Sequence, residues 1–479
     1  MIFNSFEFIF LFLPIVFILY FVLNKINFVA SKVFLLLSSL FFYGYWNPKY
    51  VPLVVGSLIV NFTIGTYLGK ENRKYRKSIL TVGIVFNVAL LSFFKYYDFF
   101  VRSVNSVVPT GLPLLNIVLP LAISFYTFQQ IAYLVDSYRF ETKNYKFYNY
   151  CLFVTFFPHL IAGPLVQHSD VMKQFEDRSK RNINYRNIAM GLFIFSIGMF
   201  KKVGIADHFA IWANQGYSMT ESLTFIDAWF TSLAYTLQLY FDFSGYSDMA
   251  IGAGLLLNIA LPRNFNSPYK ALNIQDFWRR WHITLSNFLT RYIYIPLGGN
   301  RKGNVRTYVN ILIIFFISGL WHGAGWTFII WGLLHGFASV INRLWQKAGF
   351  AMNKWLAWFI TFMFVNATWV FFRAPTFGEA KNVFKGMLGL NGFALPKQVQ
   401  KAFHLSADIP VYAFKLAPSF LTAALALLAA FIIAVTAKNS LELRDDLKPN
   451  TFNAVFCSAL LIYCIFQFQK VSTFLYFNF

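Results

Sequence analysis

Residues 310–334 read NILIIFFISGLWHGAGWTFIIWGLL and place one histidine, His322, between two apolar runs. Apolar stretches of this length are typical of helices that cross a bilayer, whose hydrocarbon core is about 30 Å thick. An ionisable ring at membrane depth is costly, so it usually faces a cavity or a partner. Gly323 and Gly325 favour a helix break and leave room for a substrate. Position alone leaves two interpretations of His322 open, a functional imidazole and a neutral ring that donates to a backbone carbonyl.

The composition of the whole chain indicates a membrane protein. Of its 479 residues, 57% are hydrophobic and only 13% are charged, and the mean hydropathy is +0.53. A soluble protein has about a quarter charged residues. Because the apolar runs are continuous rather than alternating, we expect an all-α polytopic protein and not a β-barrel. The candidate spans are residues 6–24, 28–45, 50–69, 79–100, 114–138, 187–216, 225–258, 307–322, 325–342, 355–373, 419–437 and 453–470.

One apolar segment, residues 149–168, is interrupted by Pro158, Gly163 and Pro164. Irregular backbone at membrane depth is tolerated where it lines a protein cavity. Since basic loops flank this segment on both sides, we expect it to enter the membrane and return without crossing. The run after Phe277 is short and polar on one side, which predicts a re-entrant or interfacial segment.

The net charge of +22 is explained by cytoplasmic loops facing anionic lipid, and no nucleic-acid-binding module is present. The loop KENRKYRK, residues 70–77, is the clearest inside loop. Counting spans from it places residues 262–306 inside, and residues 374–417 and the chain end outside. We expect one membrane domain over residues 1–479, in which residues 374–417 form an external docking segment and residues 474–479 an aromatic tail.

A second histidine, His282, lies among Arg279, Arg280 and Arg291. Nearby positive charge favours the neutral imidazole, which can act as a base. Taken alone, however, the pattern favours an interfacial histidine in a basic amphipathic segment. The loop LGGNRKG, residues 297–303, adds glycines and cations of a kind that can bind phosphate.

Other polar residues lie within apolar runs. The stretch YFDFSGYSDMAIG contains Asp242, Ser244 and Tyr246, and a carboxylate in such a span must be paired, protonated or hydrated. A structural polar network is the simpler interpretation. His335 is expected to be a packed histidine. The histidines and the three cysteines lack the spacing of a metal site, so we expect no metal.

The chain ends in FLYFNF, residues 474–479, with Tyr476 among three phenylalanines. Composition alone favours an aromatic anchor at the membrane interface. A tail that inserts its phenol into a cavity is the alternative.

Taken together and in order along the chain, several stretches resemble the membrane-bound O-acyltransferase superfamily. The resemblance is to its bacterial polysaccharide branch, which acetylates alginate or peptidoglycan. The stretches are SFYTFQQIAYLVDSYR (124–139), HLIAGPLVQ (159–167), FKKVGIAD (200–207), QLYFDFSGYSDMAIG (238–252), RNFNSPY (263–269), WRRWHITLSNFLTRYIYIPLGGNRKG (278–303) and LWHGAGWTFIIWGLLHG (320–336).

The resemblance implies a ring of about 11–13 helices and re-entrant segments around a funnel open to the cytoplasm. It implies that His322 is the catalytic base, that His282 orients the donor or stabilises the oxyanion, and that Tyr476 receives the acyl group. Trp321 and Trp326 are expected to form flat walls beside His322. The candidate residues for binding the donor or lining its tunnel are Trp321, Arg279, Arg280, Asp242, Ser244 and Tyr246.

We therefore expect a multi-pass O-acetyltransferase of the bacterial inner membrane. It would hold no bound cofactor and would use acetyl-CoA or an acyl carrier protein as donor. The resemblance also implies a periplasmic SGNH-type acetyltransferase as partner and an envelope polysaccharide as acceptor. A transporter or channel is the main alternative, but transporters often contain paired halves with matched broken helices, which this sequence lacks. An enzyme of the same superfamily that acylates a lipid or a protein is the nearest enzymatic alternative.

Overall fold

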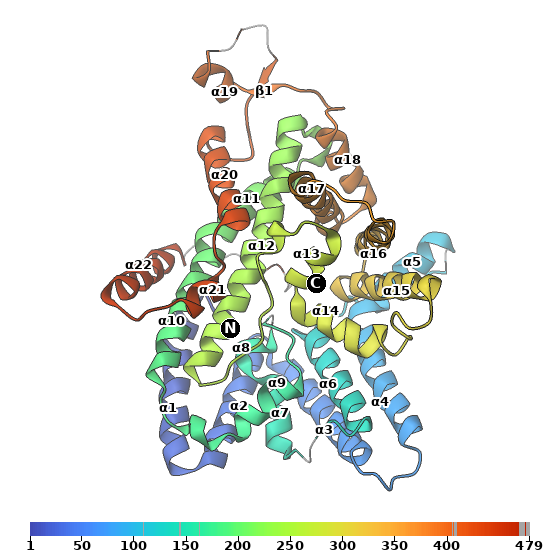
Figure 1. Cartoon of the computed structure of the whole chain (residues 1–479), viewed down its shortest axis with the longest axis vertical. Helices are drawn as coiled ribbons and strands as arrows, with labels where there is room; N and C mark the ends of the chain where they lie inside the picture. Colours follow the sequence, from blue (N-terminus) through green and yellow to red (C-terminus); the bar gives the residue numbers. More distant parts are fainter. Residues whose placement is uncertain are drawn as a thin grey trace. The chain divides into compact units, whose positions relative to one another are not determined.

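The computed structural model describes residues 1–108, 110–142, 145–161, 163–404, 406, 410–468 and 475. The regular secondary structure of this part of the chain is helical apart from two strands of two residues each (Figure 1). The chain forms two compact units. The first contains Met1–Met199, Tyr246–Arg263 and Arg444–Gln469, and the second contains Phe200–Gly245, Asn264–Leu443 and Lys470–Phe479.

The first unit contains the N-terminal helices and one helix from near the C-terminus. Its α-helices are α1 (Leu13–Ile26), α2 (Phe28–Gly44), α3 (Val51–Leu68), α4 (Arg76–Leu91), α5 (Tyr97–Val107), α6 (Ile123–Tyr138), α7 (Phe147–Thr155), α8 (Phe157–Leu160), α9 (His168–Glu176), α10 (Tyr185–Met199) and α22 (Thr451–Gln467). Its π-helical turns are η1 (Glu7–Phe12) and η3 (Ser92–Tyr96), and its 3₁₀ turns are η2 (Pro48–Tyr50) and η4 (Arg178–Arg181).

The second unit contains the histidine-bearing segments. Its α-helices are α11 (Asp207–Tyr217), α13 (Ile274–Arg280), α14 (Ile283–Leu289), α15 (Asn304–His322), α16 (Trp326–Lys347), α17 (Lys354–Arg373), α18 (Phe377–Met387), α19 (Lys397–Ala402) and α20 (Phe420–Thr436). It also contains the turns η5 (Phe200–Ala206), η6 (Thr220–Ser222), η7 (Pro268–Lys270) and η8 (Thr290–Tyr294), and the parallel strands β1 (Leu395–Pro396) and β2 (Val411–Tyr412). Helices α12 (Phe225–Leu256) and α21 (Ser440–Asp445) begin in the second unit and end in the first.

Buried amides join three helices of the first unit. Asn87 on α4 donates to the side-chain oxygen of Asn61 on α3 at 2.6 Å, and Asn61 donates to Gln130 on α6 at 3.1 Å. Ser57, one turn before Asn61, donates to the same Gln130 oxygen at 2.7 Å. Such bonds between helices at membrane depth contribute about 0.6 kcal/mol each on average. They therefore fix which faces of these helices meet rather than provide most of the stability.

Seven helical stretches of the described residues are long and apolar enough to cross a membrane, and they match seven of the spans expected from the sequence. These are Glu7–Ile26, Pro48–Leu68, Arg76–Val107, Tyr185–Tyr217, Asn304–His322, Trp326–Lys347 and Lys354–Arg373. Three more expected spans correspond to shorter apolar helices, α2, α20 and α22. The all-α, multi-pass class predicted from the composition is confirmed.

The expected span over residues 114–138 is wrong in its first part. The backbone is irregular up to Pro120, and α6 begins only at Ile123. Pro120 lacks the amide hydrogen that a helix interior needs, and Asn116 adopts a left-handed conformation with φ of 48°. The apolar composition of this stretch therefore does not produce a helix.

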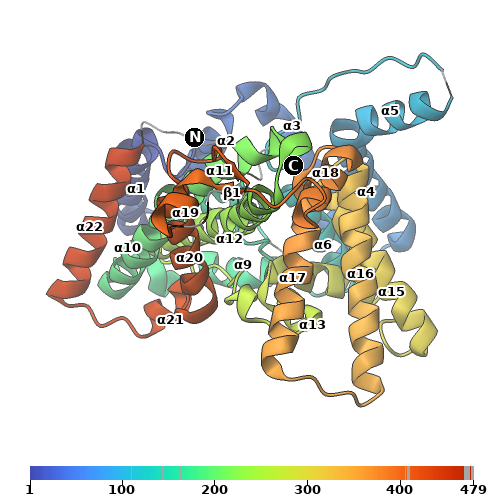
Figure 2. The same ribbon diagram turned by 90° about the horizontal axis from the view of Figure 1, so that it is seen from above.

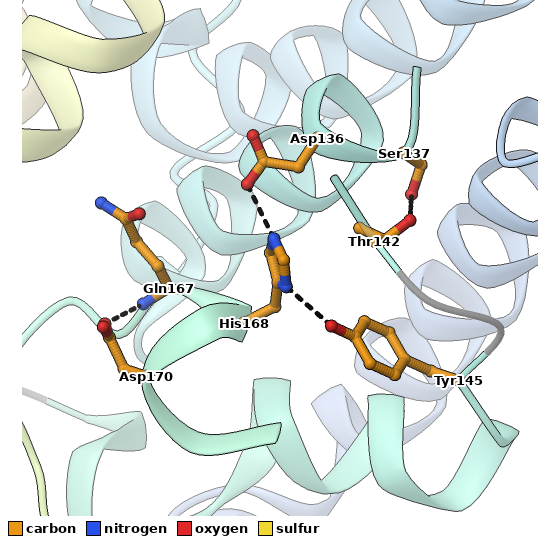
Figure 3. A network of polar contacts seen from close by, with 7 residues as sticks. All are labelled: Asp136, Ser137, Thr142, Tyr145, Gln167, His168 and Asp170. Atoms are coloured by element: carbon orange, nitrogen blue, oxygen red, sulfur yellow. Dashed lines mark hydrogen bonds and ion pairs between the residues drawn. The ribbon is translucent and has the colours of Figure 1, made fainter. Parts of the chain in front are cut away.

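The interruption expected within residues 149–168 is confirmed, and a polar network holds its far end. Helix α7 stops at Thr155 and the four-residue α8 follows. The described residues between α8 and α9, which begins at His168, have no regular structure. His168 Nε2 lies 2.9 Å from Asp136 Oδ2 on α6, and its Nδ1 lies 2.9 Å from the Tyr145 hydroxyl (Figure 3). One buried imidazole thus ties the start of α9 to α6 and to the segment before α7.

Helices α15 and α16 pack closely side by side, and α17 lies along the other side of α16 (Figure 2). A Cβ on Gly332 would lie 2.3 Å from the Phe315 carbonyl oxygen, and a Cβ on Gly319 would lie 2.5 Å from that of Phe328. Only glycine allows this approach of the two backbones. The α15–α16 pair is the frame on which His322 is held.

Candidate active site

His322 is the last residue of α15 and lies at the break before α16. Gly323 follows with an extended backbone, and α16 begins at Trp326, so the predicted helix break is confirmed. The sequence predicts that Gly323 leaves room for a substrate. This prediction is wrong, because a Cβ at Gly323 would lie 2.2 Å from the Phe328 ring. The missing side chain gives space to that ring rather than to a ligand.

Aromatic rings surround the His322 imidazole, which is 1% exposed. Its ring centroid lies 4.9 Å from that of Trp321, 5.0 Å from that of Trp331 and 5.2 Å from that of Phe372, and all three pairs are edge-to-face. Trp321 therefore forms a wall, as predicted. The same role for Trp326, which is 55% exposed at the start of α16, stays a prediction.

His282 lies between α13 and α14 in the left-handed region, with φ of 45° and ψ of 52°. Its imidazole is fully buried, and its Nδ1 lies 3.1 Å from the Asn264 side-chain oxygen. The same oxygen accepts from the Thr284 hydroxyl at 2.9 Å and from the Thr284 backbone N–H at 3.4 Å. A backbone N–H can only donate, so Asn264 presents its oxygen to this group, and His282 must donate to it from Nδ1.

This hydrogen bond fixes the state of His282, which lies outside the seven candidate spans. Burial lowers the pKa of the His282 imidazole to about 3, so the ring is neutral. With the proton on Nδ1, the Nε2 lone pair is available, and Nε2 has no hydrogen-bond partner among the described residues. The His282 and His322 ring centroids are 6.3 Å apart, and Trp321 lies 5.8 Å from the His282 ring. The structure thus brings the two predicted histidines together.

The neutral state of His282 was expected, but its predicted cause is wrong. Nearby arginine charge does not account for the lowered pKa, because burial is the dominant cause. Arg280 instead pairs with Asp276 at 2.8 Å, one helical turn earlier on α13. Arg279 lines a surface pocket, described below.

His335 provides a useful contrast. Trp278 Nε1 donates to its Nδ1 at 3.2 Å, so the His335 proton is on Nε2, which donates to the Thr368 hydroxyl at 3.0 Å. The Thr368 hydroxyl in turn donates to the Val365 carbonyl at 2.8 Å. Both ring nitrogens are satisfied, which confirms His335 as a packed histidine.

A pocket of about 390 Å³ opens beside the segments that carry His282 and His322. It lies between α13, α14, α15 and α16. Its lining includes Arg279, Arg343, Trp278 and Ser318. Ser318 lies four residues before His322 on α15, and residues at this spacing share one face of a helix. The pocket therefore combines two cations with an apolar wall and reaches the helical face that ends in His322.

The remaining candidate residues divide between the two units. Asp242 is buried in the second unit and pairs with Lys202 at 2.6 Å. Of the three states expected for this carboxylate, paired, protonated or hydrated, the structure shows the paired one. Ser244 belongs to the same unit and is also buried. Tyr246 belongs to the first unit, where its ring stacks on that of Phe3 at 4.7 Å.

Tyr476, the predicted acyl acceptor, lies outside the described residues. Leu475, which precedes it, is described, and its backbone N–H donates to Asp242 at 3.1 Å. The external docking role of residues 374–417, which contain α18, α19, β1 and β2, stays a prediction. Among the described residues, no cluster of histidine, cysteine, aspartate and glutamate could hold a metal ion.

Sequence reasoning missed two residues that shape the site, Asn264 and Lys202. Asn264 sets the tautomer of His282, although 18 residues separate them. Lys202 pairs with Asp242 and Asp207. Both residues could have been found from the sequence. Asn264 lies in the motif stretch RNFNSPY, and Lys202 lies in the motif stretch FKKVGIAD. Each is a polar residue that the fold buries, and His282 and Asp242, which they contact, lie 18 and 40 residues further along the chain.

Comparison with known proteins decides the family. Residues 57–375 match the model of the membrane-bound O-acyltransferase family, which covers more than half of the chain. The chain belongs to this family. As a membrane-bound O-acyltransferase it is an enzyme that transfers acyl groups, and the superfamily resemblance found in the sequence is confirmed.

Individual relatives of this membrane-bound O-acyltransferase span most of its length. It is 47% identical to a peptidoglycan O-acetyltransferase of Helicobacter pylori, over 100% of the chain and 98% of that relative. It is 40% identical to the "Probable alginate O-acetylase AlgI" of Pseudomonas aeruginosa, over 82% of the chain and 76% of that relative. A teichoic acid D-alanyltransferase of Bacillus subtilis is 25% identical over 55% of the chain and 70% of its own length.

Proposed function

We propose that this enzyme transfers an acetyl group from acetyl-CoA on the cytoplasmic side to a cell-envelope polysaccharide of the peptidoglycan or alginate type. The observation that carries the proposal is the pair of buried imidazoles, His282 and His322, beside a pocket that contains arginines. The names of the two similar O-acetyltransferases support the acetyl group and the polysaccharide acceptor. Coenzyme A stays inside while the polymer is outside, so the enzyme must pass the acetyl group across the membrane.

The pocket suits the donor. Arg279 and Arg343 supply positive charge for phosphate groups, and the apolar lining suits the uncharged arm that carries the thioester. The basic loop at residues 297–303 adds three glycines with positive φ, at Gly298, Gly299 and Gly303. An acidic acyl carrier protein would meet the same charges.

His322 is the general base of the proposed reaction. It takes the proton from the attacking phenol of Tyr476 while the phenol oxygen bonds to the thioester carbonyl carbon. The carbon–sulfur bond then breaks, the sulfur receives the proton from His322, and free coenzyme A and an acetyl-tyrosine ester remain. A positioned base contributes about 10²–10⁴-fold to such a step.

His282 orients the donor in this scheme. The sequence leaves two roles open for it, orienting the donor or stabilising the thioester oxyanion. The Nε2 lone pair supports the first, because a neutral imidazole protonated on Nδ1 accepts at Nε2 and cannot donate to an oxyanion there. An amide N–H of the donor is a suitable group for that lone pair.

The remaining parts of the proposal concern location and partners. The chain is a multi-pass membrane protein, and we place it in the bacterial inner membrane, where cytoplasmic acetyl-CoA is available. A periplasmic SGNH-type acetyltransferase receives the acetyl group from Tyr476 and passes it to a sugar hydroxyl. Residues 374–417, placed outside by loop charge, are its proposed docking segment.

The test uses the purified full chain in detergent with radiolabelled acetyl-CoA and no glycan. We expect label on the peptide ending FLYFNF, and we expect Tyr476→Phe and His322→Ala to abolish it. Tyr185→Phe, which changes a tyrosine that is 80% exposed, is the matched control and should label normally.

Transfer that needs partner and glycan and leaves no label on the tail would mean direct transfer and would refute the acyl-tyrosine step. Retained transfer by a folded His322→Ala variant would refute the assignment of the base. If coenzyme A is not released under either condition, the donor assignment fails.

A further inference from the structure

Three charged side chains, two of them buried and one partly buried, form a cluster in the second unit. Lys202, in the π-helical turn η5, lies 2.7 Å from Asp207 Oδ1 and 2.6 Å from Asp242 Oδ1. The Lys202 and Asp242 side chains are each 2% exposed. One lysine is thus shared by two carboxylates.

The second oxygen of Asp242 holds the C-terminal segment. Asp242 Oδ2 accepts the backbone N–H of Leu475 at 3.1 Å, across 233 residues of sequence. A hydrogen bond to an ionised acceptor is roughly twice as strong as one between neutral groups. The contact is made to the backbone and not to a side chain, so it fixes the position of the chain itself one residue before Tyr476.

The charge on Asp242 depends on Lys202. A carboxylate taken out of water without a partner tends to become protonated, and a protonated carboxyl is a weaker acceptor. Lys202 favours the ionised form of Asp242, and Asp207 is a second partner of the same lysine. When Asp242 is ionised, its hydrogen bond to the Leu475 N–H is charge-assisted.

Helix α12 connects this contact to the two histidines. Phe243 follows Asp242 on α12, and its ring meets the His282 ring edge-to-face at 4.9 Å. His282 lies 6.3 Å from His322. Two consecutive residues of α12 therefore link the two features. Asp242 binds the C-terminal segment, and Phe243 contacts His282.

We propose that Asp242, paired with the lysine Lys202 that Asp207 also contacts, is a positioning residue that anchors the C-terminal segment for acyl transfer. The three residues are called the tail anchor below. The anchor receives the Leu475 N–H and so fixes where the tail enters the site. This inference rests on the proposed function, in which the tail carries the acceptor.

Two variants remove the contact from opposite sides. Leu475→Pro removes the donating N–H and leaves the tail anchor intact, and its matched control Leu475→Ala removes the side chain but keeps the N–H. Asp242→Ala removes the acceptor, while Asp207 remains as a partner of Lys202. Because Leu475→Pro alters no buried charge, it keeps the test valid if Asp242→Ala fails to fold.

The first readout is hydrogen exchange of the peptide ending FLYFNF in the purified full chain, measured without acetyl-CoA. We expect Leu475→Pro and Asp242→Ala to speed exchange of the tail amides about tenfold or more, as the loss of a hydrogen bond to a charged group implies. Leu475→Ala should exchange at close to the wild-type rate. Unchanged exchange in both test variants would overturn the anchor.

The second readout is the rate of tail labelling by radiolabelled acetyl-CoA. An anchor for the acceptor predicts that kcat falls about tenfold or more while the KM for acetyl-CoA stays unchanged, and that Leu475→Ala retains the wild-type kcat. Faster exchange with an unchanged kcat would overturn the positioning role. Absence of label in the wild-type protein would refute the acyl-tyrosine step instead, and the exchange comparison would still decide whether the anchor exists.

Discussion

Replacing Asn264 by aspartate tests whether the enzyme uses the Nε2 lone pair of His282. The variant is isosteric, but it places a carboxylate where a neutral amide oxygen lies 3.1 Å from His282 Nδ1. In the wild-type protein burial lowers the pKa of His282 to about 3, so the lone pair is present throughout the working range of pH. A carboxylate partner favours the protonated ring and would remove that lone pair.

The expected shift of the His282 pKa follows from the distance between its Nδ1 and the oxygen of residue 264. At 3.1 Å and an effective dielectric constant of about 20, two unit charges interact by about 5 kcal/mol. Since 1.36 kcal/mol corresponds to one pKa unit, the carboxylate raises the pKa of His282 by about four units, to near neutrality. Above that pKa the Nε2 lone pair is present, and below it the lone pair is lost as Nε2 takes up a proton.

The assay is the pH profile of coenzyme A release by the purified protein between about pH 5.5 and pH 9. We expect Asn264→Asp to match the wild type at the alkaline end and to lose about tenfold in kcat/KM per pH unit below neutrality. Asn266→Asp is the matched control, because it adds the same charge two residues away on a half-buried side chain. If the Asn264→Asp variant is as active as the wild type near pH 6, the Nε2 lone pair is not needed and the reasoning fails.

Three further predictions concern stability and donor binding. His168→Ala breaks the buried contact shown in Figure 3 and should cost about 3–5 kcal/mol in thermal or denaturant unfolding, whereas the exposed His404→Ala should be neutral. Gly319→Ala forces α15 away from α16 and should cost about 1–3 kcal/mol, whereas Gly56→Ala, where a Cβ meets nothing within 4 Å, should not destabilise. Arg343→Gln should raise the KM for acetyl-CoA about tenfold with little change in kcat, as steady-state kinetics would show; an unchanged KM would exclude a donor role for this pocket residue.

Most of the helical framework could be predicted from the sequence because long apolar runs are local signals. The hairpin of α15 and α16 follows from two such runs and the glycines between them. The span over residues 114–138 failed for the opposite reason. The average apolarity of the span is little changed by Pro120, although this proline prevents a continuous helix.

The histidines of the site could be named from their motifs, but their chemistry could not. Forty residues separate His282 from His322, and no local pattern shows that their rings lie 6.3 Å apart. The charge state of His282 was predicted correctly from the wrong cause, since sequence proximity to Arg280 does not show that this arginine pairs with Asp276. The tautomer depends on Asn264, whose side-chain direction is a property of the folded chain alone.

The first unit is built from segments that lie far apart in the sequence, and this has a consequence for its biosynthesis. Helix α22 packs on α10 within that unit, yet about 250 residues of chain are made between them. At synthesis rates of about 5–20 residues per second, the face of α10 waits on the order of tens of seconds for its partner. During that interval lipid or another protein segment must cover it. A ribosome stall between the two helices would therefore leave an incomplete first unit in the membrane, open to quality-control proteases before any acyl transfer could begin.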